Sequence, residues 1–107
     1  MTRRVQLTED ALRDLDDIHA HIAAQDGLAR ADGLVDGIST VLAKLAAFPE
    51  RGEYPKELVA LGIRQFRQVH HKPYRMIYQT TAAMGVVMLI VDGRRDMQSL
   101  LQRRLLG

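Results

Sequence analysis

Cysteine is absent from the 107-residue chain, which excludes disulfide bonds and thiolate chemistry. Long hydrophobic runs are absent too, because the longest purely apolar run, Val86–Val91, is about a third as long as a membrane-spanning helix. The N-terminal stretch MTRRVQLTEDAL contains neither the apolar segment nor the small-residue cleavage site of a secretory signal. We therefore expect a cytoplasmic protein that does not associate with membranes.

Motifs for cofactors and metals are also missing. The glycines stand alone and form no phosphate-binding loop. His19 and His21 are two residues apart on a predicted helix and point in different directions, whereas helical metal ligands are spaced by four. The sequence therefore predicts no metal site and no cofactor. The carboxylates crowded on the same helix are expected to form a solvated face: Asp14, Asp16 and Asp17.

The composition that is present fits one soluble domain spanning residues 1–107, with 47% apolar and 26% charged residues. Its charge is unevenly distributed. Residues 1–63 hold seven Lys and Arg against eleven Asp and Glu, whereas residues 64–107 hold eight against two. The basic half is where we expect function, since such a patch attracts RNA, DNA or an acidic protein segment.

The first half of the chain predicts an edge strand followed by a helical hairpin. Arg3–Leu7 alternates as a strand does, and Thr8 is a typical N-cap. The first helix should end near Gly27 and the second at Pro49, and so short a link predicts an antiparallel pair. The apolar stripes comprise Leu12, Leu15, Ile18 and Ile22 in the first helix, and Leu28, Leu34, Ile38, Val41, Leu42, Leu45 and Phe48 in the second.

The second half predicts three strands, at residues 63–69, 74–81 and 86–91, and a short C-terminal helix. The fold class is therefore α+β, with the helical hairpin packed on an antiparallel sheet. Alternation along the middle strand places Tyr74, Met76 and Tyr78 on one face, toward the hairpin. Arg75 then lies in the middle of the opposite face. The other arginines of interest flank these strands: Arg64, Arg67, Arg94 and Arg95.

The last strand, VVMLIV, is apolar on both faces, and the hairpin can cover only one of them. Alternation predicts that Val87, Leu89 and Val91 share one face. The stripe of the C-terminal helix can supply part of a cover for the second apolar face: Met97, Leu100, Leu101 and Leu105.

The segments LGIRQFR, KPYRMIYQ and VDGRRDMQSLLQRRLL, in this order after a strand and a helical hairpin, resemble the RelE/ParE superfamily of type II toxin–antitoxin toxins. The resemblance covers essentially the whole chain. It implies one of two activities: RelE-like toxins cut messenger RNA in the ribosomal A site, and ParE-like toxins poison DNA gyrase. In both branches an antitoxin holds the toxin inactive.

The residues favour the ParE-like branch. RelE-like cleavage needs proton-transfer groups as well as cations, and the resemblance carries over only the cations Arg75 and Arg95. Arg64 and Phe66 stand where that branch has paired lysines, and an arginine is a poor base. We therefore assign no catalytic residue and expect the target-binding residues to be Arg64, Arg67, Arg75, Arg94 and Arg95. A ribosome-dependent ribonuclease using His70 or His71 is the alternative, and a non-toxic binding module is a third.

The expected partners are DNA gyrase and a cognate antitoxin whose C-terminal segment folds over the second apolar face to form a toxin–antitoxin hetero-oligomer. The expected antitoxin contacts are Leu89, Met97, Leu100, Leu101 and Arg75.

Overall fold

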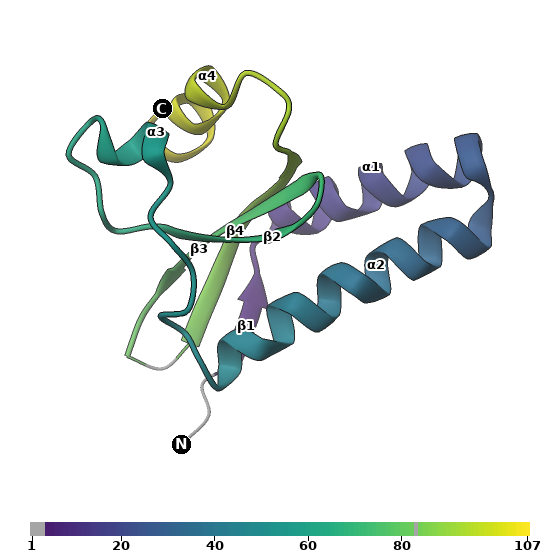
Figure 1. Ribbon diagram of the computed structural model, residues 1–107, viewed down its shortest axis with the longest axis horizontal. Coiled ribbons are helices and arrows are strands. Elements are labelled where there is room, and N and C mark those ends of the chain that lie inside the picture. The colour runs from purple at the N-terminus through teal and green to yellow at the C-terminus, as the bar shows by residue number, and fades with distance from the viewer. Residues whose placement is uncertain (1–3, 83) are drawn as a thin grey trace.

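The computed structural model describes residues 4–82 and 84–107 and confirms the α+β class (Figure 1). One four-stranded sheet has the order β1-β4-β3-β2, with the helical hairpin against one face and the two short helices α3 and α4 near the other. No helix in the described ranges is both long and apolar enough to cross a membrane. The elements are β1 (Arg4–Leu7), α1 (Glu9–Asp26), α2 (Leu28–Ala43), a 3-10 turn (Lys44–Ala46), α3 (Lys56–Val59), β2 (Arg67–His71), β3 (Tyr74–Thr80), β4 (Met84–Asp92), α4 (Met97–Leu101) and a π-helical turn (Gln102–Leu106).

The helical hairpin begins and turns as its sequence predicts. Thr8 Oγ1 accepts a hydrogen bond from the Ala11 backbone N–H at 3.0 Å, which caps α1. Gly27 separates the two helices at φ +95°, a conformation that favours glycine. The predicted stripe was wrong at its ends, where Leu12, Leu28 and Phe48 are exposed. Ala11, one position earlier, faces the core in place of Leu12, and the 3-10 turn after Ala43 breaks the helical phase that would have turned Phe48 inward.

The sheet is mixed, because β1 pairs in parallel with β4 while β2, β3 and β4 are antiparallel. The edge position of β1 is confirmed; Arg3, which was predicted to begin it, lies outside the described residues. The strand expected from Ile63 begins only at Arg67. Ile63 instead closes the turn after α3, where its N–H donates to Leu58 O at 2.9 Å, and the sequence analysis missed this short helix.

The two faces of the sheet support two separate hydrophobic clusters. Tyr74, Met76 and Tyr78 pack against the helical hairpin, as the alternation predicts. Leu89 and Val91 lie on the other face, but Val87 does not join them. A bulge at Met88 puts two β4 residues opposite one β3 position, so Val87 turns toward the hairpin.

The second apolar face is covered by the chain itself. Leu58 of α3, Phe66 and the C-terminal helix close over it, and Leu89 and Leu101 are completely buried. Met97 and Leu100 are also buried. These four side chains therefore form no open surface in this structure, and their expected contact with an antitoxin stays a prediction.

Candidate functional site

Arg75 lies on the sheet face away from the hairpin, where it was predicted, but it is buried and its charge is paired. Its Nη1 and Nη2 donate to Glu57 Oε2 and Oε1, each at 2.9 Å. Its Nε donates to Gln68 Oε1 at 2.8 Å, and Nη2 contacts the same oxygen. The two side chains of the ion pair are only 10% and 12% exposed. Arg75 is thus a buried structural cation, not the exposed contact that the sequence suggested.

The surroundings of the Arg75–Glu57 pair fix both partners. The hydrogen bond from Arg75 lowers the pKa of Glu57, against the opposing effect of burial. Gly93 leaves room for the arginine stem, because a Cβ there would lie 2.7 Å from Arg75 Cδ. The carboxylate is therefore charged at neutral pH and occupies the place where an anionic ligand of Arg75 would bind.

A cavity of about 320 Å³ opens beside this pair, lined by Glu53, Tyr54, Lys56, Gln68, His70 and Arg75. Gln68 Nε2 donates to Glu53 Oε1 at 3.0 Å, and His70 Nε2 lies 3.9 Å from the same oxygen. The described residues contain no group of three His, Asp or Glu side chains that could hold a metal ion. The cavity lining thus combines two cations, one carboxylate and one histidine.

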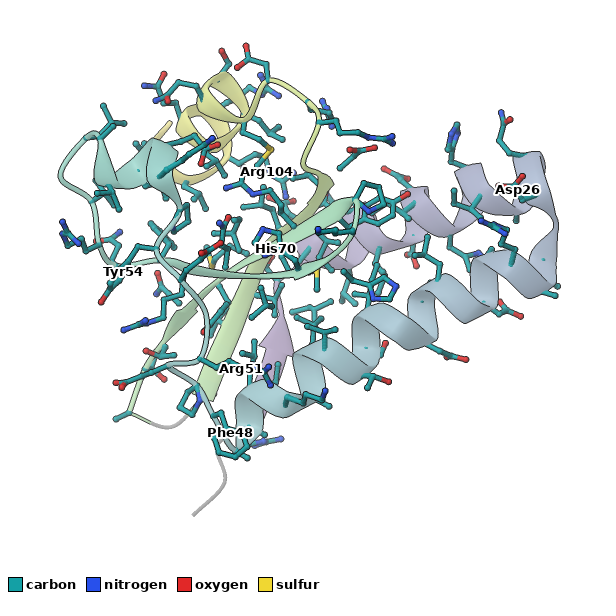
Figure 2. All side chains as sticks on the ribbon, in the orientation of Figure 1. Asp26, Phe48, Arg51, Tyr54, His70 and Arg104 are labelled. Carbon is teal, nitrogen blue, oxygen red and sulfur yellow. The ribbon has the colours of Figure 1, made fainter. Side chains whose placement is uncertain are left out.

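Tyr54 lines this cavity and belongs to the loop that leads to α3 (Figure 2). The Arg67 guanidinium lies 4.4 Å from the centre of the Tyr54 ring and that of Arg64 lies 5.6 Å away. Arg67 Nη2 also donates to Tyr54 Oη at 3.0 Å, and Nη1 donates to Gly52 O at 2.9 Å. We call Tyr54, Lys56, Arg64 and Arg67 the Tyr54 surface.

The loop that carries Tyr54 is held by hydrogen bonds to the hydroxyl of Tyr78, which is completely buried. Its hydroxyl donates to Pro49 O at 2.7 Å and accepts from the Gly52 N–H at 3.1 Å, while burial raises its pKa. Gly52 must be a glycine here, because a Cβ would lie 2.6 Å from Tyr78 Oη. The Tyr54 surface is therefore held on a rigid support.

Arg94 and Arg95 lie at the other end of the sheet. In the strand register Arg67 is opposite Tyr78, whereas Asp92 is opposite Tyr74, about 13 Å further along β3. The Arg94 guanidinium is bound by the Asp92 carboxylate at 2.6 to 3.2 Å, which lowers the pKa of Asp92. Arg95 is exposed and borders a depression whose lining includes Asp14, Asp17 and Asp92. The five predicted arginines therefore do not form one patch: two lie at the Tyr54 surface, one is buried, and two are at the far end.

One acidic residue was wrongly expected to be solvated. Asp14 is a partly buried anchor whose two oxygens accept from Arg104 at 3.0 and 2.9 Å. Its Oδ2 also accepts from the Ile90 backbone N–H at 3.0 Å. This contact satisfies a strand N–H beyond the end of β1, whose pairing with β4 stops at Leu7 and Val87.

Sequence reasoning missed Tyr54, Glu57 and Gln68. In the segment PKELV, Pro55 comes two positions before the acidic Glu57. This arrangement is typical of a first helical turn and was a usable signal for α3. The pairing of Glu57 with Arg75 had no such signal. It depends on the path of the irregular loop between α3 and β2, which no periodicity describes.

Comparison with protein families gives a match to the model described as ParE toxin of type II toxin-antitoxin system, parDE, over residues 5–97. The curated Toxin ParE3 of Caulobacter vibrioides is 28% identical over 101 residues, which cover 94% of this chain and 97% of that toxin.

Solved structures support the fold. The chromosomal ParDE toxin–antitoxin system from P. aeruginosa contains a chain that matches with a TM-score of 0.71 at 18% identity, covering 85% of this chain and 96% of that one. The toxin–antitoxin complex RelBE2 from Mycobacterium tuberculosis matches with a TM-score of 0.54 at 19% identity, covering 86% and 99%.

Proposed function

Since this chain belongs to the ParE family of type II toxin–antitoxin toxins, we propose that it acts as a growth-inhibiting toxin that docks onto DNA gyrase and does not cut RNA. The observation that carries this proposal is the Arg75–Glu57 ion pair. RNA cleavage needs a cation that can take up charge on the scissile phosphate. The Arg75 guanidinium instead donates to Glu57 and Gln68 inside the fold.

The Glu57 carboxylate competes with any phosphate for Arg75, which supports docking over RNA cleavage. A phosphate could reach Arg75 only by displacing the Glu57 carboxylate, which accepts two hydrogen bonds from the guanidinium where both side chains are nearly buried. Docking on a protein surface does not require this exchange. The geometry therefore favours inhibition by binding.

A cognate antitoxin is the second proposed partner, because the matched structures from P. aeruginosa and M. tuberculosis are toxin–antitoxin systems. We expect it to neutralise this toxin in a hetero-oligomer. Leu89 and Leu101 are not its contacts while α4 remains packed, since both are completely buried.

Two assays run side by side test the proposal. Purified protein is added to a DNA supercoiling reaction with gyrase, and to a ribosome-dependent messenger RNA cleavage reaction. We expect supercoiling to stop and the messages to stay intact. Site-specific cuts in translated messages, with supercoiling unaffected, would contradict gyrase inhibition.

A ribosome-dependent ribonuclease is the second candidate, favoured by the position of His70 in the cavity next to Arg75. An exposed imidazole there could act as a general base. Loss of cleavage in His70→Ala, with unchanged melting, would establish this activity.

A further inference from the structure

The arginines of the Tyr54 surface combine two properties: neither has an acidic partner among the described residues, and both lie against one aromatic ring. Among the residues described, no Asp or Glu forms an ion pair with Lys56, Arg64 or Arg67. Five arginines elsewhere do have such partners: Arg13, Arg30, Arg75, Arg94 and Arg104. The Tyr54 surface thus presents uncompensated positive charge around an aromatic ring that is 37% exposed.

This surface is also ordered before any partner arrives. Arg67 is held by backbone carbonyls of Glu50 and Gly52, and the loop beneath is fixed by Tyr78. Tyrosine and arginine are the residue types that most often dominate the binding energy of protein interfaces. Because the loop is already fixed, little conformational entropy remains to be lost on binding.

We propose that the Tyr54 surface is the contact through which this toxin docks onto an acidic segment of its protein target. The inference rests on the proposed function, in that it takes the protein to act by docking. Arg64 and Lys56 supply the charge, since both are exposed and neither has an internal carboxylate partner in the described chain. Tyr54 supplies the apolar contact, and Arg67 positions the ring.

An acidic protein segment fits this surface better than a nucleic acid does. Single-stranded nucleic acids stack their bases on open aromatic faces, and here the Arg67 guanidinium lies 4.4 Å from the ring centre. The chain as a whole has a formal net charge of only +2, so it offers no long basic track.

The decisive variant is the double charge reversal Lys56→Glu/Arg64→Glu. Its matched control is Lys72→Glu/Arg103→Glu, which makes the same change of charge at exposed residues that are not part of the Tyr54 surface. For wild type and both variants, growth arrest after induction, inhibition of gyrase supercoiling and thermal melting are measured. A fourth measurement is anisotropy with fluorescein-labelled single-stranded RNA.

We expect the reversal to abolish growth arrest and to raise the toxin concentration for half-inhibition of supercoiling at least about tenfold, with melting unchanged. The control should behave as wild type. If wild type arrests growth without inhibiting gyrase, the proposed target is wrong, and loss of arrest in the reversal alone still supports the surface. Arrest retained by the reversal would overturn the inference, and so would RNA binding by wild type that the reversal abolishes.

Discussion

At the scale of single residues, the arginine that the strand pattern singles out, Arg75, is neutralised by a carboxylate of the same chain. Arg75 follows a tyrosine in the middle of β3 and lies on the expected face, yet it is bound by a carboxylate from a helix eighteen positions earlier. Buried charges of this kind are costly when alone and tolerable when paired. Replacing either partner should therefore cost more than removing an exposed charge.

Glu57→Gln is expected to lower the free energy of unfolding at neutral pH by about 3 to 5 kcal/mol, because it leaves the Arg75 cation buried without a counter-charge. Urea unfolding followed by circular dichroism measures this loss. The double variant Glu57→Leu/Arg75→Met should recover most of it, since apolar residues of similar volume replace the pair. A single variant as stable as wild type would show that the pair contributes nothing.

Acid should remove the same stabilisation in wild type. Hydrogen bonding to Arg75 lowers the pKa of Glu57 below its ordinary value of 4.5. A carboxyl with a lowered folded pKa stabilises the protein above its unfolded pKa, and that contribution is lost as the pH falls through the folded pKa. The stability difference between wild type and Glu57→Gln should therefore be constant above about pH 5 and shrink below about pH 4. Unfolding curves at a series of pH values test this, and a difference that does not change with pH would contradict it.

At the scale of elements, strongly periodic segments could be predicted and irregular ones could not. The hairpin, the strand Tyr74–Thr80 and the C-terminal helix follow apolar periods of 3.6 or 2, so their buried faces were assigned correctly except at the ends of the hairpin stripes. The predicted face of Val87 was wrong, because strict alternation of side chains does not allow for the extra residue at the Met88 bulge. The four-residue helix α3 is too short to show a period, and with it Glu57 was missed.

Asp14 of α1 anchors the end of the chain, because the Arg104 that it binds lies in the turn directly after α4. Asp14→Ala removes the acceptor for Arg104 and for the Ile90 N–H, and should lower the free energy of unfolding by about 1 to 3 kcal/mol. Amide hydrogen exchange should speed up most in residues 97–106. Asp17→Ala, one turn later on the same helix and exposed, is the control and should change neither quantity. Equal effects of Asp14→Ala and Asp17→Ala would show that Asp14 does not anchor the C-terminal segment.

At the scale of the whole molecule, one sheet separates two cores, and the second core is closed by the last helix. Leu101→Ala should destabilise the free toxin by about 2 to 5 kcal/mol, because the side chain is completely buried. The cognate antitoxin should still bind and raise the melting temperature of this variant, since a partner that binds only the folded state stabilises it by mass action. Melting curves with and without antitoxin measure both effects. If the variant folds but does not bind the antitoxin, Leu101 is part of the antitoxin interface.

The closing of the second core by α4 also affects when the toxin can finish folding during its own synthesis. A chain leaves the ribosome N-terminal end first. Residues 97–105 therefore emerge after the strand that they cover, and until then Leu89 and Val91 lack the part of their cover that the C-terminal helix supplies. Arg104 completes its contact with Asp14 only after ninety further residues have been translated. We expect the nascent toxin to remain unfinished, and harmless to the cell that makes it, until translation of this segment is over.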